Sequence, residues 1–143
     1  MRAVVDTNEL LRMAAALDRS QMFTAWMNRR FELVMSDALF SEFQQVCARP
    51  FARRMLRVVY LRRFVESLRD RSIWVVPADD PDMPHCRDAK DDMVIATAIA
   101  TRADFIVTND GDLHELPLAV RLRDEYGIRV VWPQEFMKAI QQQ

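Results

Sequence analysis

The chain has 143 residues, of which 50% are hydrophobic and 29% charged, and its formal net charge is −1. This length and composition are typical of one globular domain, here residues 1–143, that buries a core. No apolar run approaches the roughly 20 residues that a membrane-spanning helix needs. Only three apolar residues separate Arg2 from Asp6, which is too few for a signal peptide. We therefore expect a cytoplasmic protein with no membrane partner.

Positive charge is concentrated in one stretch. Eight of the 18 arginines lie within residues 49–71, where two acidic residues oppose them, so this stretch carries a net charge of +6 and the rest of the chain −7. Such polarity is informative about partners, because arginine forms bidentate contacts with phosphate. Two roles fit the stretch: phosphate contact with a nucleic acid, for which Arg53, Arg54 and Arg57 are the candidates, or the solvated face of an amphipathic helix.

Short apolar runs alternate with helical segments along the chain. The expected strands cover residues 2–5, 31–35, 73–76, 105–107 and 128–132. The expected helices lie near residues 9–17, 22–27, 37–47, 51–71, 94–99 and 118–126, with a last one from residue 133. The strand segments are continuously apolar instead of alternating with polar residues, which is typical of parallel strands covered on both faces. We therefore predict a three-layer α/β/α domain whose central parallel sheet has four to five strands.

Local signals predict several helix ends. Thr7 or Asn8 is expected to cap the first helix and Ser36 the third, because short polar side chains accept hydrogen bonds from the backbone at helix N-termini. Gly127 is expected to end the helix before the last strand, since glycine is the usual residue at a helix C-terminus.

Acidic residues gather near the ends of the expected strands. Asp6 follows the first strand directly, Asp110 follows the fourth, and Glu42 lies one turn into the helix after the second. Three further aspartates introduce the helix that leads into the fourth strand: Asp88, Asp91 and Asp92. In a right-handed doubly wound sheet these positions share the carboxyl edge, where such sheets bind ligands. Taken singly, each also has a structural explanation as a helix cap, a turn residue or a solvated side chain.

Convergence of these carboxylates would be costly without a compensating charge. Two carboxylates about 5 Å apart repel by roughly 3 kcal/mol at an effective dielectric constant of about 20. Protonation or a bound cation relieves this repulsion, and an all-oxygen ligand set suits Mg²⁺ or Mn²⁺. Two such cations about 4 Å apart can activate a water and stabilise both oxygens of a phosphodiester displacement. No pair of His or Cys residues has the spacing of a zinc site.

The motifs resemble those of the PIN-domain nucleases, and among them the toxin components of toxin–antitoxin pairs related to the VapC toxins. The resemblance covers nearly the whole chain. It rests on VVDTN at residues 4–8, SDALFSEF at 36–43, CRDAKDD at 86–92, ADFIVTNDGDL at 103–113 and GIRVVWPQEF at 127–136. No single motif is specific, whereas their shared order and spacing are strong evidence.

The resemblance implies one PIN-like domain that acts as a metal-dependent endoribonuclease, with Mg²⁺ or Mn²⁺ in an acidic pocket. The implied catalytic residues are Asp6, Glu42, Asp92 and Asp110. The implied metal ligands are Asp6, Glu42, Asp88, Asp91, Asp92 and Asp110. The third acidic position stays open, because spacing like that of VapC favours Asp92, whereas an Asp-x-x-Asp pattern favours Asp88 and Asp91.

Other implications concern the surroundings of the pocket and the partners. Asn8 and Thr108 are expected to orient carboxylates or a metal-bound water. Glu9 departs from the family, in which this position is usually apolar, and either adds charge near the site or faces solvent. The implied partners are an RNA substrate, a cognate antitoxin and a second copy of the chain. An acidic antitoxin segment is then a third candidate partner for the arginine-rich stretch.

Two other functions are compatible with part of this pattern. A magnesium-dependent phosphatase with an aspartyl nucleophile needs a second aspartate two residues after the first, and this chain has Asn8 there. A PIN-like domain that only binds RNA or protein has no need of four converging carboxylates. Both are therefore less favoured than the nuclease.

Overall fold

The computed structural model describes residues 1–77 and 80–142; Ala78, Asp79 and Gln143 lie outside the described part. Five parallel strands form a sheet in the order β3-β2-β1-β4-β5. The strands are β1 (Arg2–Val5), β2 (Glu32–Met35), β3 (Ile73–Trp74), β4 (Phe105–Val107) and β5 (Arg129–Val131). The order makes β1 central and β4 its neighbour, so their carboxyl ends lie side by side.

The helices follow the strands in alternation. They are α1 (Thr7–Ala16), α2 (Gln21–Met27), α3 (Asp37–Cys47), α4 (Pro50–Met55), α5 (Val58–Arg71), α6 (Asp92–Thr101), α7 (Leu116–Tyr126) and α8 (Pro133–Gln141), with short 3₁₀ helices η1 (Leu17–Arg19) and η2 (Ala89–Asp91). Within the described residues, no helix is both long enough and apolar enough to cross a bilayer.

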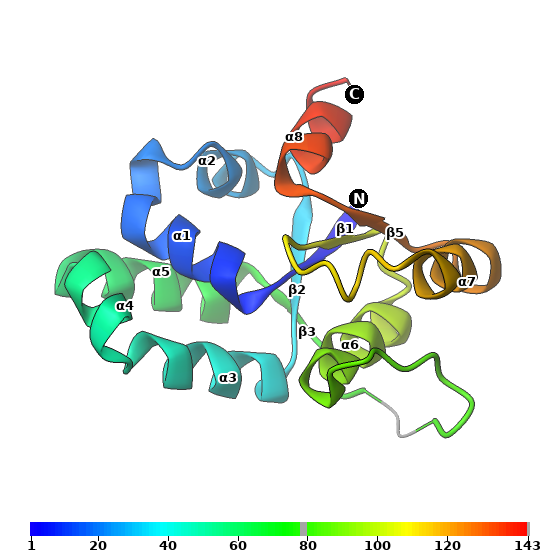
Figure 1. Ribbon diagram of the computed structural model, residues 1–143. Helices are drawn as coiled ribbons and strands as arrows, with labels where there is room; N and C mark the ends of the chain where they lie inside the picture. Colours follow the sequence, from blue (N-terminus) through cyan, green and yellow to red (C-terminus); the bar gives the residue numbers. More distant parts are fainter. Residues whose placement is uncertain (78–79, 143) are drawn as a thin grey trace.

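Helices cover both faces of the sheet (Figure 1). On one side α1 packs against α3 and α5, and α4 lies beyond them. On the other side α6 packs on β1, β2 and β4, and α7 packs near β5. The parallel sheet and its two helical layers confirm the predicted fold class.

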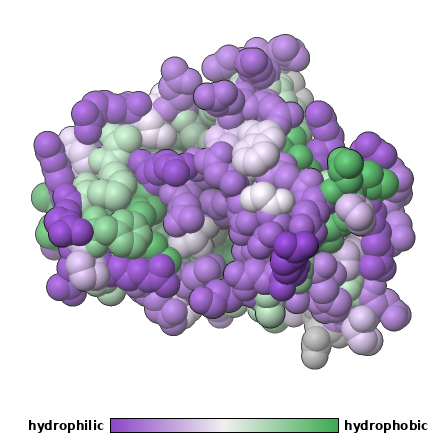
Figure 2. Space-filling view, viewed as in Figure 1, coloured by the Kyte–Doolittle hydropathy of each residue, from purple (hydrophilic) through white to green (hydrophobic). Residues whose placement is uncertain are grey.

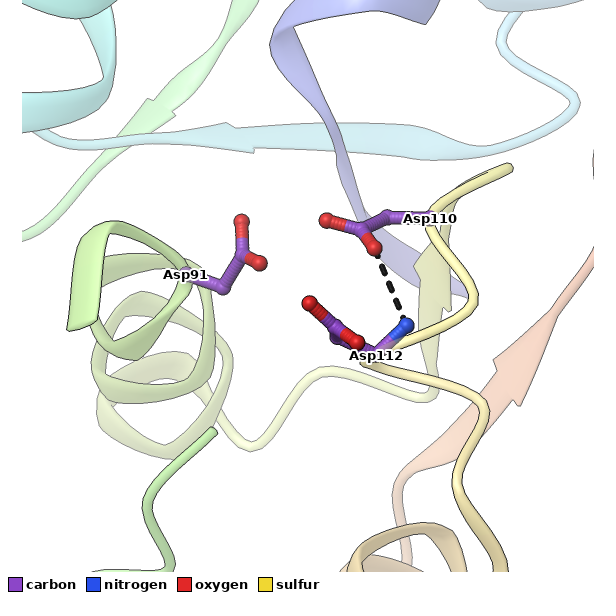
Figure 3. A group of neighbouring side chains, drawn as sticks. All are labelled: Asp91, Asp110 and Asp112. Atoms are coloured by element: carbon purple, nitrogen blue, oxygen red, sulfur yellow. Dashed lines mark hydrogen bonds between the residues drawn. The ribbon is translucent and has the colours of Figure 1, made fainter. Parts of the chain in front are cut away.

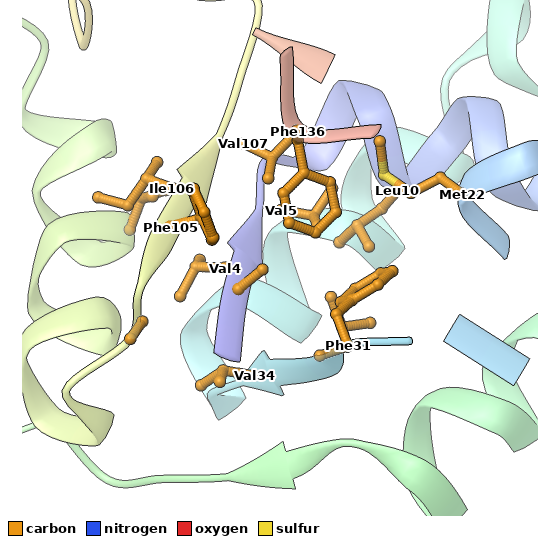
Figure 4. Close-up of a cluster of buried hydrophobic side chains, with 14 of the residues drawn as sticks. Val4, Val5, Leu10, Met22, Phe31, Val34, Phe105, Ile106, Val107 and Phe136 are labelled. Carbon is orange, nitrogen blue, oxygen red and sulfur yellow. The ribbon is translucent and has the colours of Figure 1, made fainter. Parts of the chain in front are cut away.

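The central strand is fixed by burial on both faces. Val4 and Val5 each expose at most 1% of their surface. On one face Phe136 of α8 contacts the rings of Phe31 and Phe105, with centroids 4.9 and 5.4 Å apart (Figure 4). Burying one such large apolar side chain stabilises the fold by about 1.5–3 kcal/mol. This packing fixes β1 in the core between its neighbouring strands.

The basic stretch is not one helix, as predicted, but two. Leu56 is extended at φ −96° and ψ 130°, which ends α4 and places Arg57 at the N-cap of α5. Leu56 packs with buried Ala52 under the break, and β-branched Val58 and Val59 favour the helix less than straight-chain residues do. Val58 and Val59, the first two residues of α5, are apolar but 73% and 64% exposed.

Asp6, rather than Thr7 or Asn8, caps the first helix. Its carboxylate accepts a hydrogen bond from the Glu9 N–H at 2.9 Å, and α1 begins at Thr7. The aspartate is the last extended residue before the helix, so it has the backbone conformation that a cap requires. The other two predicted ends are confirmed: Ser36 caps α3, and Gly127 ends α7 at φ 69°.

Candidate metal centre

Asp6 stands at the carboxyl end of the central strand with both oxygens engaged. Oδ1 accepts from the Glu9 N–H, and Oδ2 accepts from the Thr108 hydroxyl. Each carboxylate oxygen retains a further lone pair. Asp6 is therefore oriented by helix α1 and by the residue that follows β4, and it can still accept another ligand.

Thr108 links this carboxylate to the loop after β4. Its side chain is fully buried, and its hydroxyl oxygen also accepts the Asp110 N–H at 2.9 Å. One hydroxyl donates once and accepts twice, so both bonds are compatible. The Thr108 carbonyl accepts from His114 Nε2 at 2.8 Å, and the imidazole stacks on Trp132 at 3.7 Å. The placement of Thr108 fits its predicted orienting role, which stays a prediction.

Three carboxylates meet at this edge of the sheet. One oxygen each of Asp91, Asp110 and Asp112 lies within 4.8 Å of the others. Figure 3 shows Asp91, from the turn before α6, directed at the two aspartates of the loop after β4. The Asp112 N–H donates to Asp110 Oδ1 at 2.9 Å, which closes that loop. Two segments distant in sequence thus supply one acidic group.

The surroundings of Asp91 hold its proton unusually tightly. Burial raises the pKa of its carboxyl to about 7, and hydrogen bonding with Asp110 and the charges of Asp110, Asp88 and Glu42 act in the same direction. An ordinary aspartate carries its full charge near neutral pH. The acidic group therefore binds a proton, or an equivalent positive charge, near pH 7.

Glu42 approaches the same region from α3. It is half-buried, its carboxylate accepts from the Thr7 hydroxyl at 2.9 Å, and its charge acts on Asp91. Thr7 therefore orients Glu42, while the neighbouring Asn8 is exposed. A role for Asn8 in the site stays a prediction.

The remaining candidates of the third acidic position make other contacts. Asp92 accepts from the Cys86 N–H at 2.7 Å and pairs with His85 Nδ1 at 3.0 Å, so its carboxylate supports the loop before η2. Asp88 accepts from the Lys90 N–H at 3.0 Å and caps η2. Of the three alternatives, Asp91 is the one in the three-carboxylate group. Metal binding by Asp88 and Asp92 stays a prediction.

Asp112 was not among the sequence candidates. It falls in an Asp-Gly-Asp turn, of which the sequence motifs predict only the first aspartate as a ligand. The signal that points to it is its spacing: Asp112 lies two residues after Asp110, and the turn folds its carboxylate back toward the same space.

Glu9, noted as a departure from the family, does not face solvent. Its side chain is 8% exposed, and it accepts hydrogen bonds from Arg12 and from the Asn109 side-chain amide. Burial is the main factor that raises its pKa, and the Arg12 charge opposes this. Because Asn109 lies between Thr108 and Asp110, Glu9 fastens the same loop to α1.

The predicted phosphate contacts lie on α4 and just beyond it. Arg53, Arg54 and Arg57 are exposed, and Arg57 stands over the Tyr60 ring at 5.4 Å. Arg53 borders an apolar groove with Cys47 and Leu56. Their contact with nucleic acid stays a prediction.

The donor set of the acidic group fits a divalent cation. All its ligand atoms are carboxylate oxygens, the type that Mg²⁺ and Mn²⁺ prefer. None of the ion pairs within residues 1–77 and 80–142 includes Asp91, Asp110 or Asp112. In the described part of the chain, these three carboxylates therefore lie together without an ion-pair partner.

Comparison with known proteins gave one family. A family model described as PIN domain matches residues 2–112, a range that includes all the acidic residues discussed above. No curated protein matched the chain significantly.

The raised pKa of Asp91 predicts a pH dependence of stability. Its folded pKa of about 7 exceeds the ordinary 3.8, so its contribution to stability is complete below about pH 4 and is lost as the pH rises through 7. Asp91→Asn removes the titration, so the variant should gain stability relative to the wild type from pH 4 to 7. Urea unfolding in chelator-treated buffer measures this. Asp124→Asn, at an exposed position on α7, is the charge-matched control. If the stability difference between Asp91→Asn and the wild type stays constant with pH, the raised pKa of Asp91 is contradicted.

The Thr108 hydroxyl predicts a second effect. Thr108→Val keeps the shape but removes the donor to Asp6 and the acceptor of the Asp110 N–H, which should cost about 1–3 kcal/mol. Thr108→Ser keeps the hydroxyl and should lose only about 1 kcal/mol for the missing methyl group. Urea unfolding measures both variants against the wild type, and a valine variant as stable as the wild type would show that the hydroxyl contributes nothing.

Proposed function

Because the chain belongs to the PIN domain family, whose members are generally nucleases, we propose that it is a metal-dependent endoribonuclease and the toxin of a type II toxin–antitoxin pair. The observation that carries the nuclease is the group formed by Asp91, Asp110 and Asp112 at the carboxyl edge of the sheet. A group of carboxylates without a paired cation is suited to a metal ion that contacts phosphate.

Asp91, Asp110 and Asp112 would hold the cation, with Asp6 and Glu42 beside them. When bound, Mg²⁺ or Mn²⁺ supplies a more acidic water and positive charge for the oxygens of the phosphodiester. Asp88 and Asp92 complete the proposed ligand set from η2 and the start of α6.

The protein's own groups prepare this site in advance. The hydroxyls of Thr108 and Thr7 fix the carboxylates of Asp6 and Glu42, so little rotamer freedom is lost when a ligand arrives. Asp92 positions the loop before η2 through its bond to the Cys86 N–H. Burial and the neighbouring carboxylates raise the pKa of Asp91 to about 7, and a bound cation would favour its charged form.

The toxin role rests on the resemblance to the VapC toxins and is supported by the surface of α4 and α5. Figure 2 shows apolar surface on the side of the molecule where these helices lie, bordered by hydrophilic residues. Exposed Val58 and Val59 stand near a groove of about 590 Å³ between α3, α4 and α5. An antitoxin segment with apolar and acidic residues fits this surface, because residues 49–71 carry a net charge of +6. Cytoplasmic action and a possible homodimer belong to the same proposal.

The nuclease is tested with purified protein and a single-stranded RNA. We expect cleavage that requires Mg²⁺ or Mn²⁺ and that Asp110→Asn lowers by about 100-fold or more, since loss of residues that merely support metal ligands already costs about 10–100-fold. Asparagine keeps the Oδ1 acceptor for the Asp112 N–H, so the loop should remain folded. Asp124→Asn should cleave at the wild-type rate. Cleavage unaffected by Asp110→Asn or by chelation would refute the proposal, and binding without cleavage would favour the binding module.

The toxin role has its own test. Co-expression with the product of a short neighbouring reading frame should relieve growth arrest, and Val58→Glu with Val59→Glu should weaken that complex by about tenfold or more, because charge enters an apolar contact. RNA cleavage should be unchanged. Leu116→Glu, on α7 and 75% exposed, is the matched control. If the protein neither arrests growth nor binds that product, the toxin role fails while the nuclease stands.

A further inference from the structure

A small pocket opens beside Glu42, between α3 and the η2 turn. Its volume is about 340 Å³, and Gln45, Arg49, Lys90 and Met93 are among the residues that line it. Arg49 lies between α3 and α4 and caps α4, and Lys90 precedes Asp91 of the acidic group. The pocket therefore brings two cations, from segments far apart in sequence, to the border of the proposed metal centre.

Both cations are available to a ligand. Arg49 and Lys90 are exposed, and the ion pairs found in the described part of the chain involve neither of them. Glu42 shares the pocket, but its carboxylate is hydrogen-bonded to the Thr7 hydroxyl at 2.9 Å. That carboxylate thus has a hydrogen-bond partner within the fold.

The arrangement of charge favours an extended anion. A polynucleotide carries one negative charge per nucleotide, so a site made of carboxylates repels the phosphates on either side of the one it cleaves. A guanidinium and an ammonium at the border offset this repulsion for one of those phosphates. Gln45 adds an amide N–H donor on the same wall.

From this juxtaposition we infer that Arg49 and Lys90 bind the substrate phosphate adjacent to the cleaved one. The inference rests on the proposed nuclease and replaces the α4 arginines as the principal phosphate contact. Arg53 borders the apolar groove on a different face of α3, whereas Arg49 lines the pocket that includes Glu42. The two residues position the RNA backbone and take no part in bond cleavage.

The salt dependence of RNA binding tests this assignment. In an Asp110→Asn background, affinity for a single-stranded RNA oligonucleotide is measured at several KCl concentrations. The logarithm of the binding constant falls as the logarithm of the salt concentration rises, and each lost phosphate contact lowers the magnitude of this slope by about 0.7. Because both residues contact one phosphate, we expect a decrease of about 0.7 for the double variant, a smaller decrease for Arg49→Gln or Lys90→Gln alone, and binding about tenfold weaker at low salt.

Arg19→Gln and Lys138→Gln are the controls, because they make the same charge change at exposed positions outside the pocket. Their slopes should match the background. Unchanged slopes for Arg49→Gln and Lys90→Gln, or a decrease confined to the controls, would overturn the phosphate site. If the protein with Asp110 intact still cleaves RNA in that case, the nuclease survives and the pocket alone is refuted. No cleavage and no RNA binding would refute both.

Discussion

The carboxyl edge of the sheet depends on the hydroxyl of Thr108. It donates to Asp6 at the end of β1 and accepts the N–H of Asp110 beyond β4, so one buried oxygen joins the two central strands to the acidic loop. The parallel pairing of β1 with β4 brings these residues together. Because backbone pairing and side-chain bonds fix the same geometry, the carboxylates are held by the core and not by a mobile surface loop.

The burial and repulsion of carboxylates in this centre lower the stability of the folded protein, and a bound cation would relieve both. Burial and mutual repulsion hold a proton on Asp91 near neutral pH, while the chain supplies no cation to the group among its described ion pairs. A ligand that binds only the folded state adds its binding energy to stability. The sign of the surface charge changes across a short distance, because Arg49 and Lys90 line the pocket that borders the carboxylates. One edge of the sheet thus presents an acidic centre with a basic border.

The strand order made part of this site predictable from sequence. Asp6 and Asp110 follow apolar runs, and any parallel sheet puts such residues on one edge. The choice among Asp88, Asp91 and Asp92 was not predictable, because three residues of a tight turn point in different directions, and Asp92 turns toward the Cys86 N–H. The sequence also does not indicate that the basic stretch divides into two helices, because leucine is a good helix former. Leu56 is extended where it packs under the break between α4 and α5.

The separation of the two ends of the site has a consequence for biosynthesis. Asp6 and Thr108 are 102 positions apart, and Asp112 comes later still. Chains emerge from the ribosome N-terminus first, so Asp6, Glu9 and Glu42 are made long before the strand and loop that complete the edge. During translation the acidic centre therefore cannot assemble until the nascent chain extends beyond residue 112.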